Sequence, residues 1–175
     1  GQFDQAIKAS KEIEDAAKRS QGLSYAATAM ATAGQMQPAE QIYTLALQTA
    51  QGIKDENKRM SSLSVIAQGM AQTKQFDKAL QVAEDINNDK YASDAFSGIA
   101  QAMATAGRFD QALQIAKKIS DVNIGSNTLS TVAMTMARAG QFDESLRVAQ
   151  TINDSLTRLD ALAEIINIIK IKAQK

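Results

Sequence analysis

The side chains that could do chemistry in this sequence are carboxylates, and they recur at fixed places. Grouped carboxylates can serve as general acids and bases or can bind metal ions. The chain has no Cys and no His, which excludes thiolate and imidazole catalysis, disulfides and soft-metal sites. Eight aspartates stand at two recurring positions, the first held by Asp4, Asp77, Asp110 and Asp143 and the second by Asp15, Asp55, Asp121 and Asp154.

Recurrence at predicted helix starts favours a structural role for these aspartates. A carboxylate just before a helix accepts a hydrogen bond from a free N–H group of the first turn. We therefore expect both sets to cap helices, with Asn88 taking the second position in one repeat. With the aspartates in this role, no nucleophile and base stand together. We expect no enzyme, no cofactor site and no metal site.

The aspartates belong to a repeat that must position them. Phe76, Phe109 and Phe142 are 33 residues apart, whereas Phe3 precedes Phe76 by 73 residues, which is 33 plus 40. A longer copy lies in that gap and places Tyr43 at the aromatic position. The sequence thus predicts a single domain over residues 1–175, built from units 1–33, 34–73, 74–106, 107–139 and 140–175.

The longer unit carries seven extra residues before Tyr43. Seven residues turn a helix through about 700°, which is close to two full turns. The insertion therefore lengthens the first helix of this unit without rotating its buried face. Its start moves back to Pro38, a residue that suits a first helical turn.

Each unit also contains a second helix with one apolar stripe, because its apolar residues recur at steps of three and four. Glycines at 34, 107 and 140 end three of these helices. About ten helices in five pairs are therefore expected, and stacked pairs would share one core as an all-α solenoid. Buried methionines are expected in the stripe, at Met30, Met70, Met103 and Met136.

Composition excludes several partners. Lys plus Arg and Asp plus Glu are both 19, so the net charge is zero and a nucleic-acid partner is not expected. No run of 18 apolar residues exists, so we expect no membrane insertion. The chain opens on Gly1 without a signal-like segment, and we expect it to be a piece of a longer array.

The repeat resembles the tetratricopeptide repeat, in a divergent, Ala-rich bacterial-type form with a period of 33 and one unit of 40. Residues that carry the resemblance in one helix are Phe96, Ile99, Ala100 and Met103, and in the next Gly107, Phe109, Ala112, Ala116 and Ile119. The resemblance covers the whole chain. It implies a right-handed solenoid and a role in protein–protein interaction, as a scaffold or adaptor that binds a protein or peptide partner.

The resemblance also implies a concave binding face lined by one helix of each pair. Carried over position by position, this face is polar and nearly uncharged, so hydrogen bonds and shape would give its specificity. A solvated face without a ligand is the alternative. The residues of this predicted face are Gln21, Ser24, Thr28, Ser61, Ser64, Gln68, Asp94, Ser97, Gln101, Asn127, Ser130, Met134, Asp160 and Asn167.

The last helix holds more apolar residues than one stripe can bury. End units of a solenoid normally turn a polar face outward, so something is expected to cover this end. A following segment is one explanation. Head-to-tail stacking with another copy of the chain is the other, which would make the protein a structural subunit. The residues expected at such an end contact are Ile165, Ile168, Ile169 and Ile171.

Overall fold

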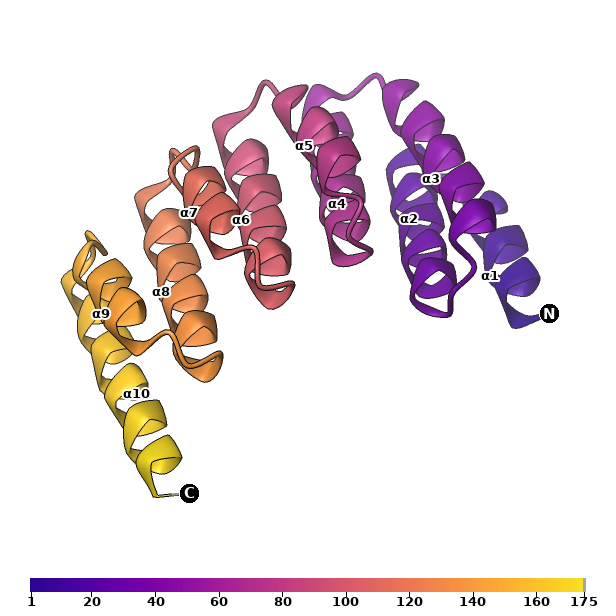
Figure 1. Ribbon diagram of the computed structural model, residues 1–175. Helices are drawn as coiled ribbons and strands as arrows, with labels where there is room; N and C mark the ends of the chain where they lie inside the picture. Colours follow the sequence, from indigo (N-terminus) through magenta and orange to yellow (C-terminus); the bar gives the residue numbers. More distant parts are fainter. Residues whose placement is uncertain (175) are drawn as a thin grey trace. The chain divides into compact units, whose positions relative to one another are not determined.

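The computed structural model describes residues 1–174, so position 175, the last of the predicted fifth unit, lies outside it. The described part is all-α, with ten helices and no strand (Figure 1). The expected number of helices is thereby confirmed. The helices are α1 (Gln2–Lys11), α2 (Ala16–Thr32), α3 (Met36–Gln51), α4 (Glu56–Gln72), α5 (Phe76–Glu84), α6 (Asp89–Thr105), α7 (Phe109–Ala116), α8 (Val122–Arg138), α9 (Phe142–Gln150) and α10 (Ser155–Ala173).

The chain divides into two compact units, Gly1–Ala95 and Phe96–Lys175, with the boundary inside α6. In the first unit, α2 contacts α1, α3 and α4, and α4 also contacts α3 and α5. In the second unit, α8 contacts α7, α9 and α10, and α9 also contacts α10. In both units, therefore, a long second helix is covered by the helix that follows it and by the next long helix.

The predicted extension of one first helix is confirmed. Helix α3 has 16 residues, whereas α5, α7 and α9 have 9, 8 and 9. Helix α3 starts at Met36, two residues earlier than expected, and Pro38 lies in its first turn. Tyr43 on this helix is 1% exposed, so the longer helix keeps its aromatic residue in the core.

The second set of aspartates caps helices as predicted. Asp15 accepts hydrogen bonds from the N–H groups of Ala17 and Lys18 at the start of α2. Asp154 accepts one from Thr157 at 2.7 Å at the start of α10. The remaining caps of this set are Asp55 on α4, Asn88 before α6 and Asp121 on α8.

The same prediction was wrong for the first set. Asp77, Asp110 and Asp143 lie inside the first turns of α5, α7 and α9. These helices begin at the preceding Phe, and their N-cap residues make no side-chain cap hydrogen bond. Asp4 likewise lies within α1. A carboxylate inside a first turn still suits the positive end of the helix dipole.

A tight turn at the end of each preceding helix explains this early start. The turn before α5 has Lys74 at a φ of 63°, and the turns before α7 and α9 have Gly107 and Gly140 at 77° and 92°. Gly34, before α3, has a φ of 85°, so the three predicted left-handed glycine ends are confirmed. The N–H group of Gly107 bonds to the carbonyl of Ala104, and that of Arg108 bonds to the carbonyl of Met103, both at 2.9 Å. Helix α7 begins directly after this pair of bonds, which leaves no room for an aspartate cap.

The core is built from small residues and methionines. The predicted methionine positions are buried, with Met30, Met70, Met103 and Met136 between 2% and 5% exposed. Ala27, Ala67, Ala100 and Ala133, three residues earlier on each helix, are all 0% exposed. Small side chains let helices approach closely, and methionine fills the irregular gaps that remain.

Candidate functional site

The predicted binding residues all lie on the second helices and are divided between the two units. In the first unit they lie on α2, α4 and the beginning of α6, and in the second unit on the rest of α6, α8 and α10. Asn127, Asp160 and Asn167 are exposed. Ser24 and Ser64 are buried, at 0% and 3% exposure. The remaining predicted residues are half-buried.

The burial of Ser24 follows from a close approach between α2 and α4. A Cβ atom placed on Gly69 of α4 would lie 3.0 Å from Ser24 Oγ and 2.7 Å from Thr28 Oγ1. Only glycine fits there without a shift of the neighbouring side chains. Ser24 is therefore a packing residue between two helices, and it presents no surface to a partner.

Thr28 is also committed to the structure. Its hydroxyl lies 2.8 Å from the hydroxyl of Tyr43 on α3, and it donates a hydrogen bond to the carbonyl of Ser24 at 2.9 Å. Burial raises the pKa of Tyr43, and the hydrogen bonds of its hydroxyl with Thr28 and Thr73 partly offset this. The pair ties α2 to α3.

A repeated side-chain arrangement distinguishes two other positions of the predicted face. Gln68 Nε2 donates to Ser64 Oγ at 3.1 Å in the first unit, and Gln101 Nε2 donates to Ser97 Oγ at 3.1 Å in the second. Both glutamines are half-buried and lie one helical turn after the serine. The donated bond fixes each amide and leaves its carbonyl oxygen Oε1 without a hydrogen bond to any of residues 1–174.

A shallow hollow of about 330 Å³ lies in the first unit, at the N-terminal ends of α2, α4 and α6. Two residues of the predicted face, Gln21 and Ser61, line it. An ion pair of 3.1 Å between Lys58 and Asp15 crosses it. The N–H group of Lys18, followed by the Lys58 ammonium, lowers the pKa of the Asp15 carboxyl. The hollow offers both charged and uncharged hydrogen-bonding groups.

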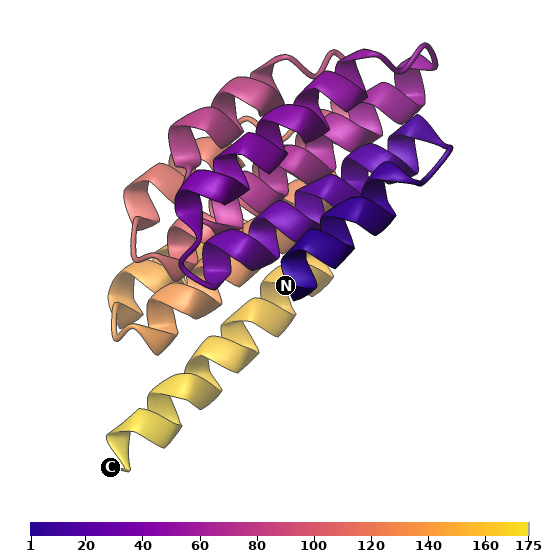
Figure 2. The same ribbon diagram turned by 90° about the vertical axis from the view of Figure 1, so that its right-hand side faces the viewer.

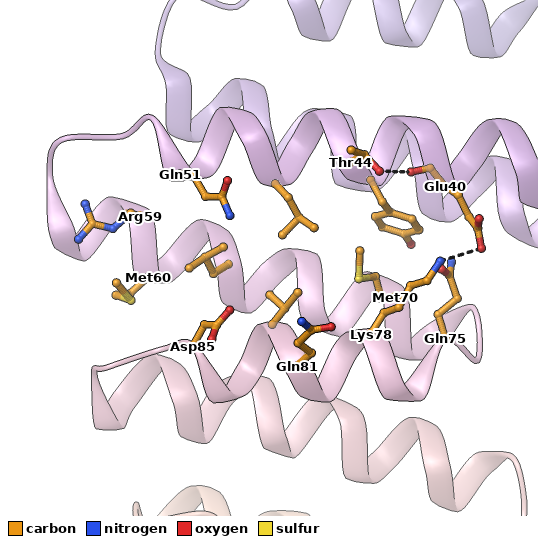
Figure 3. A pocket seen from close by; sticks show the side chains of 14 residues that line it. Glu40, Thr44, Gln51, Arg59, Met60, Met70, Gln75, Lys78, Gln81 and Asp85 are labelled. Atoms are coloured by element: carbon orange, nitrogen blue, oxygen red, sulfur yellow. Dashed lines mark hydrogen bonds and ion pairs between the residues drawn. The ribbon is translucent and has the colours of Figure 1, made fainter.

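A larger groove of about 610 Å³ lies between α3 and α5, with α4 as its floor, and the sequence interpretation missed it. Figure 3 shows Glu40 and Lys78 facing each other across one end, where they form an ion pair of 2.9 Å, with Arg59 at the other end. Leu47 and Leu63 supply apolar lining. This groove can receive an apolar side chain of a partner between two charged ends.

The second unit contains a smaller groove of the same kind. It holds about 390 Å³ between α7 and α9 and is lined by Leu113 and Leu129, which stand 66 residues after Leu47 and Leu63. In each groove a half-buried Leu, Leu47 or Leu113, directly follows a fully buried Ala. A purely helical period does not distinguish such a residue from core.

The residues expected at an end contact differ in burial along α10. Ile165 and Ile168, at 0% and 9% exposure, are buried in the core of the second unit. Ile169 is half-buried. Ile171 is 50% exposed. The exposed apolar residues of this helix outside that predicted set are Leu156, Leu159 and Ile166.

Residues 1–174 bring no three His, Cys, Asp or Glu side chains together in a way that could hold a metal ion. Across the same residues, each helix falls short of the length or the apolar content that crossing a bilayer requires.

Comparison with known proteins places few constraints on this chain. No protein-family model matches it, and no curated protein matches it. Among solved structures it is similar to Ton1535 from Thermococcus onnurineus NA1, with 14% sequence identity and a TM-score of 0.47. That similarity covers 93% of this chain and 83% of the other.

Proposed function

We propose that the five helix pairs stack into one right-handed, tetratricopeptide-like solenoid that binds a protein partner through the polar face of its second helices. The 33-residue period continues through α6 across the boundary between the units, which supports a continuous stack. Within each unit, the contacts of α2 with α4 and of α8 with α10 support the proposed stacking of second helices.

The observation that carries this proposal is the fixed orientation of Gln68 and Gln101. Each amide is held by a serine one turn earlier, and each leaves a carbonyl oxygen available. A partner in extended conformation presents backbone N–H groups at regular intervals, and these are suitable donors to such oxygens. Because the serines pre-orient the amides, less side-chain freedom is lost on binding.

The charge of the face predicts how binding depends on salt. Among the predicted residues only Asp94 and Asp160 are charged. Screening weakens interactions between charges much more than neutral hydrogen bonds. We therefore expect binding whose affinity changes little with ionic strength and whose association rate gains little from electrostatic steering.

A displayed library of random linear peptides provides the test. Peptides that bind the parent chain are selected from the library. The affinity of the tightest-binding peptides is then measured for the parent and for the triple variant Gln68→Ala/Gln101→Ala/Asn127→Ala. Loss of a hydrogen bond costs about 0.5–1.5 kcal/mol, so we expect the triple variant to bind at least about tenfold more weakly. Its melting curve should match that of the parent.

The matched control is Gln5→Ala/Gln48→Ala/Gln114→Ala, which removes three exposed glutamines from the first helices α1, α3 and α7. This control should bind like the parent. Equal affinity of the parent and the Gln68/Gln101/Asn127 variant for the selected peptides would refute the proposed face. If only the control variant binds these peptides more weakly, binding lies on the first helices.

A further inference from the structure

Helix α10 carries a second apolar stripe, on the face opposite its core residues Ala161, Ile165 and Ile168. Leu156 and Leu159 are 72% and 63% exposed, and Ile166 is 46% exposed. Figures 1 and 2 show α10 as one continuous helix whose last turns extend past α8 and α9. The stripe occupies positions 156, 159, 163 and 166, at steps of three, four and three residues, and Lys170 follows four residues later in the same line.

Three of these positions are small and buried in two earlier second helices that other helices cover. In α8, which contacts α9 and α10, the equivalents of Leu159, Ile166 and Lys170 are Ser126, Ala133 and Ala137, at 3%, 0% and 0% exposure. In α2, which contacts α3 and α4, they are Ser20, Ala27 and Ala31, at 0%, 0% and 8%. The small residues on this face of α2 and α8 allow the covering helices to pack closely against it.

Helix α10 departs from this design at two positions. Ile166 takes the place of an alanine that is 0% exposed in all four preceding second helices, and Lys170 takes the place of an alanine that is at most 8% exposed. A further helix pair of the same kind would collide with these larger side chains. The occupant of this face therefore packs at a wider spacing than the repeats do.

The spacing of the stripe indicates what such an occupant is. Steps of three and four residues are those of a coiled-coil seam, where large side chains of two helices interlock. The seam has Asp160 beside its first half and Lys170 at its other end. In an antiparallel pair about Ala163, Lys170 of one copy lies opposite Leu156 and one helical turn from Asp160 of the other copy, whereas a parallel pair would set Lys170 against Lys170.

The exposed surface of α1 argues against this helix as the partner in a head-to-tail contact. Its apolar residues Phe3 and Ile7 pack inward against Met30, Ala31 and Ala39. Its other residues are mostly polar and exposed. Burying Leu159 and Ile166 against them would remove polar groups from water without a partner.

We propose that the outward face of α10 is an interface between two copies of this chain, formed by antiparallel pairing of their α10 helices about a two-fold axis near Ala163. Each copy buries Leu156, Leu159 and Ile166 against the other. One helix pair buries less than the roughly 1,600 Å² of a standard stable interface. We therefore expect a reversible dimer with a dissociation constant in roughly the micromolar range.

Light scattering across a wide concentration range tests the pairing. The mass of the parent should rise from 18.8 kDa to twice that value and no further. The variant Leu159→Glu/Ile166→Glu should stay at 18.8 kDa with an unchanged melting curve, because both residues are exposed. The control Tyr25→Glu/Val122→Glu alters residues that are 63% and 60% exposed elsewhere, and it should dimerise like the parent.

The absence of cysteine makes the orientation directly testable. Leu156→Cys and Lys170→Cys chains, mixed and mildly oxidised, should form a mixed disulfide, and neither chain alone should cross-link efficiently. Efficient cross-linking of each variant with itself would overturn the antiparallel arrangement.

Three other outcomes would overturn the interface itself. A parent that stays monomeric at every concentration would show that two copies do not pair through α10. A mass that rises in the Leu159→Glu/Ile166→Glu variant would place the contact elsewhere. A mass that climbs beyond two copies would indicate open head-to-tail stacking.

Discussion

Helices α8 and α10 belong to the same unit and share one register, yet their outward faces differ. Both begin at an aspartate cap and both bury an aliphatic residue completely, Val132 in α8 and Ile165 in α10. Their outward faces differ at Ala133, which is fully buried, and Ile166, which is 46% exposed. The size of the residue on this face thus reflects whether another helix of the repeat covers it.

The largest predicted effect concerns the repeat position held by Met103 in α6, Met136 in α8 and Ile169 in α10. Met103 on α6 is 2% exposed, whereas its equivalent on α10, Ile169, is half-buried. Met103→Ala should therefore lower the free energy of unfolding by about 2–5 kcal/mol. Ile169→Ala should cost clearly less, and urea titration measures both. Equal losses would mean that α10 is packed as tightly as α6.

Exchanging the residues that differ sharpens the comparison. Ala133→Ile places the α10 residue into the buried position of α8, and overpacking should lower the free energy of unfolding by about 1–3 kcal/mol. Ile166→Ala places the α8 residue on the exposed face of α10. This variant should change the free energy of unfolding by less than about 0.5 kcal/mol at protein concentrations where the chain is monomeric. A harmless Ala133→Ile would show that α8 is not covered closely.

Local signals made much of the fold predictable. The period of the apolar residues, the glycines at 34, 107 and 140 and the second set of aspartates each act within a few residues of the chain. These features predicted the number of helices, the long α3 and the caps. The first helices were placed too late because the turn before them, rather than Asp77 or Asp110, sets where they begin.

The candidate site was less predictable, because exposure depends on neighbouring helices. Ser24 and Ser64 have the polarity of surface residues but are buried. Ile165 and Leu159 are both apolar residues of α10, and only contact with α8 and α9 distinguishes the buried one from the exposed one. The groove between α3 and α5 likewise arises from helix packing that no single stretch of sequence encodes.

Close packing between second helices gives the next prediction. A Cβ on Gly69 would lie 2.7 Å from Thr28 Oγ1, so Gly69→Ala should destabilise the first unit by about 1 kcal/mol despite the better helix propensity of alanine. Gly125 of α8 would place its Cβ 3.7 Å from Ile119. Gly125→Ala should therefore stabilise by about 0.5–1 kcal/mol. Thermal melts of the two variants should shift in opposite directions.

The smallest predicted effect concerns a feature that α8 and α10 share. The N–H and hydroxyl groups of Thr157 lower the pKa of the Asp154 carboxyl at the start of α10. Such a group stabilises the fold above its unfolded pKa, and this contribution is lost as the pH falls through the lower, folded value. Asp154→Asn should thus flatten the acid side of the melting temperature plotted against pH, whereas Asp110→Asn, which removes no cap, should alter it less.

Disulfide trapping across the boundary of the two units tests the proposed continuous solenoid most directly. Thr28 and Gly69 meet within the first unit, and Gln68 and Ala102 occupy the equivalent positions one repeat later. If the repeats form one stack, mild oxidation should close Gln68→Cys/Ala102→Cys within one chain as readily as Thr28→Cys/Gly69→Cys. If the disulfide forms in Thr28→Cys/Gly69→Cys but not in Gln68→Cys/Ala102→Cys, the result would contradict a solenoid that continues through both units.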